Sequence, residues 1–410
     1  MMKGLQIFSA AILATTSAIV PSAYAIDVSL NVGVEGRHFF EDAAYSQQTS
    51  NQLSTFIKPE FVWDDADNSQ RVSFVPYYRY DAADDERSHG DIRELMWMHW
   101  QGPWEIRAGI GKVFWGVTES LHLVDVINQT DSVDAADGDE KLCQPMVHGI
   151  WLSDSGTFEA FVLPGFRERT FAGEEGRLRA PYVVNDDAIY QANAEQRHTD
   201  LALRWSRSIE LMEYPLDLSV SLFRGTSRDP AYLPDIELIG VTPVVTALTP
   251  YYAIQNQAAA TVQYSLEGWL LKTELLRREY NDPTLEDYSA AVSGFEYTLV
   301  GPFDSSMDLG LLLEYQYDER DASLTTSQND IFAGMRFAFN DAASSEVLAG
   351  VTQDLDNAGS WSFFLEASTR LRSNMTIDVN AFLLGADTQD DLLYTLRRDD
   401  FVEVALNFYY

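Results

Sequence analysis

The sequence contains a single cysteine, Cys143, and few basic residues. One cysteine excludes a disulfide within the chain. There are 28 lysines and arginines against 63 aspartates and glutamates, so the formal net charge is −35. This balance argues against a nucleic-acid partner, because phosphates need a basic protein face. It fits an acidic soluble protein or a protein that faces lipopolysaccharide and the external medium.

The mature part of the chain has no long apolar run and no enzyme signature. The best candidate for a transmembrane helix, residues 236–250, is broken by Pro243 and is too short. There is no G-x-S-x-G, H-E-x-x-H, P-loop or C-x-x-C motif, and the six histidines show no metal-ligand spacing. We therefore expect a protein that is not an enzyme and holds no cofactor or metal. A barrel enzyme with a histidine on its rim is the weaker alternative.

The N-terminus has the three parts of an export signal. Lys3 supplies the positive charge, residues 5–20 form an apolar segment, and Ala23-Tyr24-Ala25 offers small residues at a cleavage site before Ile26. The apolar segment is too short for a comfortable bilayer span. The sequence predicts a signal peptide at 1–25 and a single barrel domain at 26–410.

What the mature chain does contain is alternation with a period of two. In residues 308–317 (DLGLLLEYQY), leucines and tyrosines share one face and charged or polar residues share the other, with Leu312 the exception. Such segments, about ten residues long, are typical of the strands of a transmembrane barrel. We count about eighteen, with sixteen as the alternative: 26–36, 51–63, 69–81, 89–100, 103–115, 145–153, 156–167, 197–208, 213–225, 252–266, 269–280, 286–300, 306–318, 329–340, 344–354, 360–371, 374–385 and 398–410.

The connections between these segments alternate in length. Every long one follows an odd-numbered segment, near 37–50, 116–144, 168–196 and 226–251. Bacterial barrels have short periplasmic turns and long external loops. The alternation therefore predicts an all-β, antiparallel, up-and-down transmembrane barrel with an even strand count. Trp63, Trp100, Trp104 and Trp269 lie beside short turns, where an aromatic girdle is expected.

The last segment carries a resemblance. Residues 402–410 (VEVALNFYY) alternate and end in Phe408-Tyr409-Tyr410. This resembles the final strand of Gram-negative outer-membrane β-barrels, which their assembly machinery recognises. The resemblance implies the bacterial outer membrane as location. It implies outer-membrane lipid, lipopolysaccharide and the assembly machinery as partners, and leaves the oligomeric state unknown.

The longest loop carries a second resemblance. Residues 107–131 (RAGIGKVFWGVTESLHLVDVINQTD) resemble a segment of uncharacterised putative porin families. In general porins a loop after an early strand folds into the lumen and narrows it. By that resemblance a constriction would include Glu119, His122, Asp125, Asn128 and Asp131. An external loop packed on the rim explains the stretch equally well.

The alternation directs many basic side chains toward the lumen. They are Lys58, Arg79, Arg93, Arg107, Arg204, Lys272, Arg278, Arg336 and Arg370. They could form a ladder that guides anions, but ordinary cross-strand pairing is favoured, because inward acids and bases nearly balance. Arginines in the 168–196 loop could likewise bind an anion, although a solvated loop is the simpler interpretation.

The sequence thus favours a porin-like channel for passive diffusion of small hydrophilic solutes or ions. The alternative is a barrel that acts through its external loops as a receptor, adhesin or structural protein.

Overall fold

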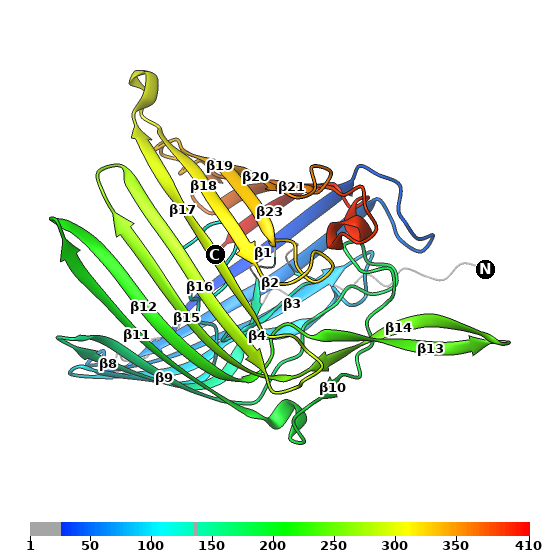
Figure 1. Cartoon of the computed structure of the whole chain (residues 1–410). Coiled ribbons are helices and arrows are strands. Elements are labelled where there is room, and N and C mark those ends of the chain that lie inside the picture. Colours follow the sequence, from blue (N-terminus) through cyan, green and yellow to red (C-terminus); the bar gives the residue numbers. More distant parts are fainter. Residues whose placement is uncertain (1–25, 135–137, 139) are drawn as a thin grey trace, which may run out of the picture.

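The computed structural model describes residues 26–134, 138 and 140–410. The predicted signal peptide lies outside the described residues. Eighteen strands form one sheet (Figure 1). They are β1 (Ile26–Phe39), β2 (Asn51–Asp64), β3 (Gln70–Asp81), β4 (Gly90–Gln101), β5 (Trp104–Gly111), β8 (Gln144–Ser153), β9 (Gly156–Pro164), β11 (Thr199–Leu211), β12 (Tyr214–Thr226), β15 (Ile254–Ser265), β16 (Trp269–Tyr280), β17 (Tyr288–Val300), β18 (Asp308–Asp318), β19 (Asn329–Ala338), β20 (Glu346–Asp354), β21 (Trp361–Arg372), β22 (Met375–Gly385) and β23 (Phe401–Tyr409).

The sheet closes on itself. β1 pairs antiparallel with β23, with Asn31 opposite Tyr409 and Phe39 opposite Phe401. All the other neighbours in the sheet also pair antiparallel, including β5 with β8, β9 with β11 and β12 with β15. Closure leaves no strand edge unpaired, which is the condition for a sheet in a bilayer. The prediction of an eighteen-stranded antiparallel barrel is confirmed.

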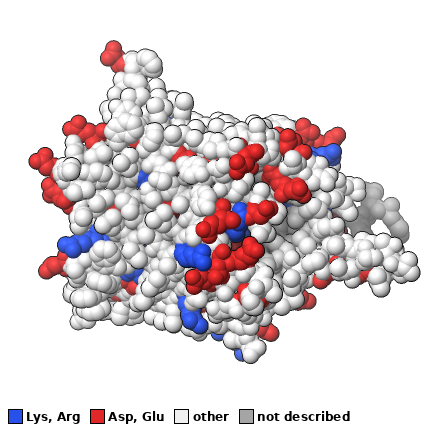
Figure 2. All heavy atoms as spheres, viewed as in Figure 1, with Lys and Arg blue, Asp and Glu red and all other residues white. Residues whose placement is uncertain are grey.

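The outer face of the barrel is apolar because of the period-two alternation. On β11 and β12, for example, Leu201, Leu203, Val220 and Leu222 are all exposed, while the residues between them face inward. Figure 2 shows one side of the molecule as a largely uncharged surface, with acidic side chains at its left edge and a cluster of acidic and basic side chains near the middle of the view. A band of this kind is what lipid-facing strands require.

No helix among the described residues is long and apolar enough to cross a bilayer.

Connections are short at one end of the barrel and long at the other, as the sequence predicts. We call these the short-turn end and the long-loop end. The smaller elements are β6 (Gln129–Thr130), β7 (Lys141–Leu142), β10 (Ile189–Tyr190), β13 (Ala231–Ile239), β14 (Thr242–Tyr252), and the 3₁₀ helices η1 (Glu195–Arg197), η2 (Pro302–Asp304) and η3 (Leu392–Leu396). Except for η2, they lie in the connections of the long-loop end.

Two local expectations differ from the structure. The strand expected over 103–115 ends at Gly111, because the chain then turns into the lumen. The 226–251 connection contains the hairpin β13–β14, which projects away from the barrel (Figure 1). Its strand character was missed because it interrupts the regular sequence of barrel strands.

Three of the four girdle tryptophans behave as expected. Trp63, Trp104 and Trp269 occupy outward positions beside short turns, and Trp104 stacks on Trp151 with ring centroids 5.5 Å apart. Trp100 does not. It pairs with Glu105 on the inward face. Val75 pairs with Glu94 and Pro76 with Ile92, so Arg93 is an extra residue on β4 and reverses the facing of the residues that follow it.

Candidate functional site

The lumen changes character along the strands. On β1, the inward residues near the short-turn end, Asp27 and Ser29, are exposed to solvent. The inward residues near the long-loop end, Glu35, Arg37 and Phe39, are buried. β2 repeats this gradient. The short-turn half of the lumen is therefore open to solvent, and the long-loop half is packed.

The packing comes first from the 112–143 loop, which connects β5 to β8 and crosses the lumen. Glu274 on β16 accepts hydrogen bonds from the backbone N–H groups of Val117 (2.6 Å) and Val124 (3.2 Å). Glu314 on β18 accepts from the backbone N–H of Glu119 (2.8 Å). Both glutamates face inward and are buried. Two wall carboxylates thus hold the loop tip, several strands away from where the loop begins.

The same loop buries apolar side chains against the wall. Trp115, Val126 and Ile127 belong to one cluster with the inward Phe161 on β9 and Phe223 on β12. The rings of Trp115 and Phe161 meet edge to face at 5.5 Å. Contacts of this kind stabilise by removing apolar area from water. The loop is therefore docked along the β9–β16 side of the lumen.

Of the five residues predicted to form a constriction, Glu119 and His122 keep partly exposed side chains. Glu119 lies 2.8 Å from the Arg336 guanidinium and 3.7 Å from the Lys272 ammonium. The ring of His122 meets Phe114 at 4.8 Å. Glu119 thus places two of the predicted lumen cations around one loop carboxylate.

Asn128 is buried and joins the two ends of the loop. Its amide donates to the carbonyl oxygens of Gly111 (3.0 Å) and Leu142 (2.9 Å) and accepts from the N–H of Val113 (2.8 Å). All three bonds are within the loop and its adjoining strand. Asn128 therefore joins the two ends of the loop by hydrogen bonds and does not line an open surface.

Asp125 is also held away from solvent. Its side chain is 1 % exposed and accepts from the N–H of Trp115 at 3.3 Å, with the Lys141 ammonium at 4.0 Å. Burial raises the pKa of Asp125 to about 6, against the opposing effect of Lys141. The loop therefore contains one carboxyl group that titrates near neutral pH.

Asp131, the fifth residue, is fully buried. It accepts from Arg93 (3.0 Å) and from the Thr170 hydroxyl (2.8 Å). With His89 and Asp134 it forms a group whose ligand atoms lie within 4.8 Å, a spacing compatible with a metal ion. Arg93 also contacts Asp134, so both carboxylates already have a cationic partner. We assign no metal to this group.

A network of arginines on β1–β4 receives the second half of the loop. The Arg87 guanidinium contacts Glu35 at 2.5 Å and donates to the carbonyl oxygen of Val133 at 2.8 Å. Arg79 contacts Glu35 at 3.0 Å. Arg37 contacts Glu403 on β23 at 2.5 Å. The sequence signalled Arg79 by alternation but not Arg87, which lies in the acidic loop before β4 and turns inward.

All nine basic residues predicted for the lumen occupy inward positions of their strands. Arg278 pairs with Asp229 at 2.6 Å, Arg204 with Glu159 at 3.3 Å and Arg107 with Glu105 at 2.6 Å. Lys58 and Arg370 are exposed to the solvated half. Most of these cations have a carboxylate partner, so their guidance of anions stays a hypothesis.

A second inward loop, 165–198, closes over the opposite side. Arg177 is buried, contacts Asp399 at 2.6 Å and lies over the Phe39 ring at 4.3 Å. Arg169 contacts Asp229 at 2.9 Å. These arginines hold the loop to the barrel mouth. Sequence reasoning treated this loop as solvated, because its partners are hundreds of residues or several strands away.

One part of the inner wall carries a row of aromatic rings. Phe332, Phe364, Phe382, Phe401 and Phe39 follow one another across β19, β21, β22, β23 and β1, with successive ring centroids 5.8, 6.4, 5.4 and 5.4 Å apart. Phe364 and Phe382 remain partly exposed. In the sequence, Phe364 interrupts the alternation of apolar and polar residues in 360–370, and the structure shows it as a lumen-facing ring.

No protein-family model and no curated protein sequence matches this chain. The solved structures that match this chain include porins. A triple mutant of the Rhodopseudomonas blastica porin has 12 % identity and a TM-score of 0.43, over 94 % of this chain and 100 % of that chain. Engineered proteins of asymmetric conductivity match with 12 % identity and a TM-score of 0.44 over the same shares.

The architecture itself defines the class of protein. The sheet is closed, antiparallel and even-stranded, its outer face is apolar, and its interior is polar and charged. These are the features of a porin-like transmembrane β-barrel.

Proposed function

We propose that this protein is a passive channel of the bacterial outer membrane for small hydrophilic solutes and ions. The observation that carries the proposal is the solvated half of the lumen, where inward charges such as Asp27 and Lys58 are exposed. An eighteen-stranded barrel is wide enough to hold water. The docked 112–143 loop would narrow this lumen beside Glu119, and no catalytic step is involved.

The same proposal orients the barrel. Long loops would face outside and short turns the periplasm, as in bacterial barrels. β23, ending near Phe408-Tyr409-Tyr410, would then be the strand that the assembly machinery recognises. The apolar outer face would contact outer-membrane lipid and lipopolysaccharide.

We further propose a preference for cations. In the short-turn half of the lumen, β17 to β22 carry more inward acids than bases. The acids are Glu296, Asp308, Glu346, Glu366 and Asp378, and the bases are Arg336 and Arg370. Arg336 is drawn toward Glu119 and Glu296. Fixed charges along an aqueous pore set the field that ions meet.

The test is electrical. Purified, refolded protein in a planar bilayer should give discrete conductance steps, and a potassium chloride gradient should give a reversal potential of the sign that marks cation preference. Arg370→Glu should strengthen the preference, while Thr246→Glu on the projecting hairpin serves as a control outside the pore. Absence of current would overturn the channel, and an anion-selective reversal potential would overturn the proposed sign.

A second candidate function rests on the hairpin β13–β14. Its tip is apolar and exposed, with Leu238 72 %, Ile239 66 % and Val241 95 % accessible. Isolated surface residues of this kind are common, but a projecting apolar tip can mark a docking element. Replacing 236–245 by an Asn-Gly turn should leave conductance intact. If the protein is a receptor or adhesin, the same change should abolish attachment of whole cells to a surface.

A further inference from the structure

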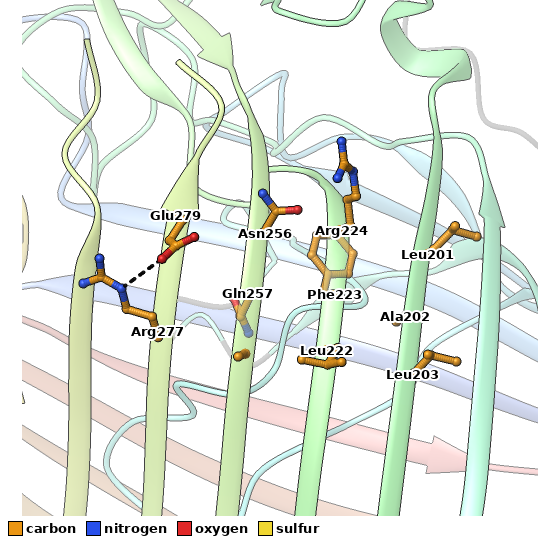
Figure 3. Close-up of a pocket in the computed structure, with 11 residues that line it drawn as sticks. Leu201, Ala202, Leu203, Leu222, Phe223, Arg224, Asn256, Gln257, Arg277 and Glu279 are labelled. Carbon is orange, nitrogen blue, oxygen red and sulfur yellow. Dashed lines mark ion pairs between the residues drawn. The ribbon is translucent and has the colours of Figure 1, made fainter. Parts of the chain in front are cut away.

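The lipid-facing wall carries a groove at its long-loop end (Figure 3). It has a volume of about 390 Å³ and runs over β11, β12, β15 and β16. Leu201, Leu203 and Leu222 are exposed on one side of it. Its floor is at Ala258, which pairs with Leu222 on one neighbour and with Arg277 on the other. Because the Ala258 side chain is smaller than those of its neighbours, it leaves a groove about as wide as one side chain.

The end of this groove nearest the long loops is basic. Arg224 faces outward there, is exposed, and has no ion pair within 4.0 Å among the residues that the structure describes. Figure 3 shows Arg224 on one side of Asn256 and the Arg277–Glu279 ion pair on the other. Charge on a lipid-facing surface is costly at mid-membrane and nearly free close to the interface. Arg224 lies two residues from the end of β12, at the level of lipid headgroups.

Arg277 is in a different situation. Its guanidinium lies 3.6 Å from Glu279, 3.9 Å from Asp287 and 3.6 Å from Glu319. These carboxylates compensate its charge and hold it at the rim. Arg224 is therefore the positive charge available to a ligand in the groove.

A second groove on the same wall provides a contrast. It has a volume of about 430 Å³, lies over β8, β9, β11 and β12, and shares Leu203 and Leu222 with the first. Its outward lining is apolar and aromatic, including Trp151, Phe158 and Ala160, and the charged residues beside it face inward. The two grooves are similar in size, but the second lies nearer the short turns and has no basic end.

We propose that the groove over Ala258 binds one acyl chain of an outer-leaflet glycolipid, the lipid A part of lipopolysaccharide, and that Arg224 binds its phosphate. An apolar groove fits the acyl chain, and a free guanidinium at headgroup level matches a phosphate through paired N–H donors. The long-loop end selects the outer leaflet, so the proposal rests on the barrel orientation proposed above.

The test uses the full mature barrel in detergent, with native mass spectrometry to count lipids bound from added lipid A or, in a separate arm, phosphatidylglycerol. The wild type should retain one lipid A in preference to phosphatidylglycerol. Arg224→Ala and Ala258→Phe should each weaken lipid A binding about tenfold, the loss expected for one charge-assisted contact or a blocked groove. Arg224→Lys should restore part of the binding.

The matched control is Ala160→Phe, which fills the second groove and should leave lipid A binding unchanged. Because the three altered residues face lipid, all variants should fold and conduct as the wild type does, and conductance recorded in parallel separates this site from the channel proposal. Equal retention of lipid A by Arg224→Ala and the wild type would overturn the site. So would preference for phosphatidylglycerol, or an equal loss in Ala160→Phe.

Discussion

The two halves of the lumen differ although the same strands build both. In the long-loop half, inward charges such as Glu35 and Arg93 are buried and joined in ion pairs. In the short-turn half, inward charges such as Lys58 and Arg370 are exposed. The alternation along a strand therefore determines which way a side chain points. The loops that fold inward determine whether it contributes to packing or to the field in the pore.

The largest change should follow from removing the loop tip. Replacing residues 117–124 with Gly-Ser-Gly removes every contact with Glu274 and Glu314 and should raise single-channel conductance severalfold. The measurement is current in planar bilayers. The hairpin replacement at 236–245 is the control, since that segment lies outside the lumen. Unchanged conductance would mean that the loop does not narrow the pore.

The second largest effect should be on the free energy of unfolding, which should depend on the half of the lumen in which a charge is removed. Arg93→Gln leaves Asp131 without its arginine partner in a buried site and leaves Asp134 with Arg79 alone, and it should lower the free energy of unfolding by about 3–5 kcal/mol. Urea unfolding of the refolded barrel reports this loss, with Arg93→Lys as the milder variant. A loss no greater than that of Arg370→Gln would remove the distinction between the two halves.

Changing Glu274 or Glu314, the two carboxylates that hold the loop tip, should have an intermediate effect on the loop. Glu274→Gln and Glu314→Gln each weaken charge-assisted hydrogen bonds, worth about 1.5–3 kcal/mol apiece. We expect faster hydrogen exchange at Val117 to Val124 and greater open-channel noise, without loss of the barrel. Glu105→Gln, near the short turns, is the matched control, and equal noise in that variant would contradict a clamp role.

The loop should also respond to pH. Because burial raises the pKa of Asp125 to about 6, the folded loop binds a proton more tightly than the unfolded chain does. The cost of ionised Asp125 is present above that pKa and is relieved as pH falls through it. Open-channel noise should thus decrease from pH 7 to pH 5, and Asp125→Asn should be quiet at both values. If Asp125→Asn kept the full change of noise with pH, Asp125 would not be the group responsible for it.

The smallest effect belongs to the solvated half. Lys58→Gln should change the free energy of unfolding by no more than about 0.5 kcal/mol, because the side chain is exposed. It should still shift the reversal potential slightly toward cations. Substantial destabilisation would show that the short-turn half is packed after all.

Much of the fold could be predicted because its signal is local. The segment expected over 306–318 is β18, Asp308–Asp318, and that over 269–280 is β16, Trp269–Tyr280. Trp100 faces inward because the β-bulge opposite Val75 and Pro76 reverses the facing of the later residues of β4. The pattern of apolar and polar residues in one strand does not reveal such a bulge. The hairpin β13–β14 was missed since it belongs to no barrel strand.

The site was harder to predict, because its contacts join residues far apart in the chain. Alternation places Glu274 and Glu314 in the lumen, yet nothing near them in sequence shows that they accept hydrogen bonds from Val117 or Glu119. The resemblance of residues 107–131 to a porin segment predicts that Asn128 and Asp131 lie near a constriction. In the structure Asn128 and Asp131 bind within the loop and to Arg93.

By itself the sequence determined the strand count, the facing of most side chains and the end of the barrel that carries the long loops. Those properties depend on the two-residue period and on turn length, which each segment expresses alone. Tertiary structure alone decided that the 112–143 and 165–198 loops fold inward, that Glu274 and Glu314 hold one of them, and that one half of the lumen stays solvated. These features depend on which surfaces, far apart in the sequence, exclude water by packing against each other. Only the closed barrel brings those surfaces into contact.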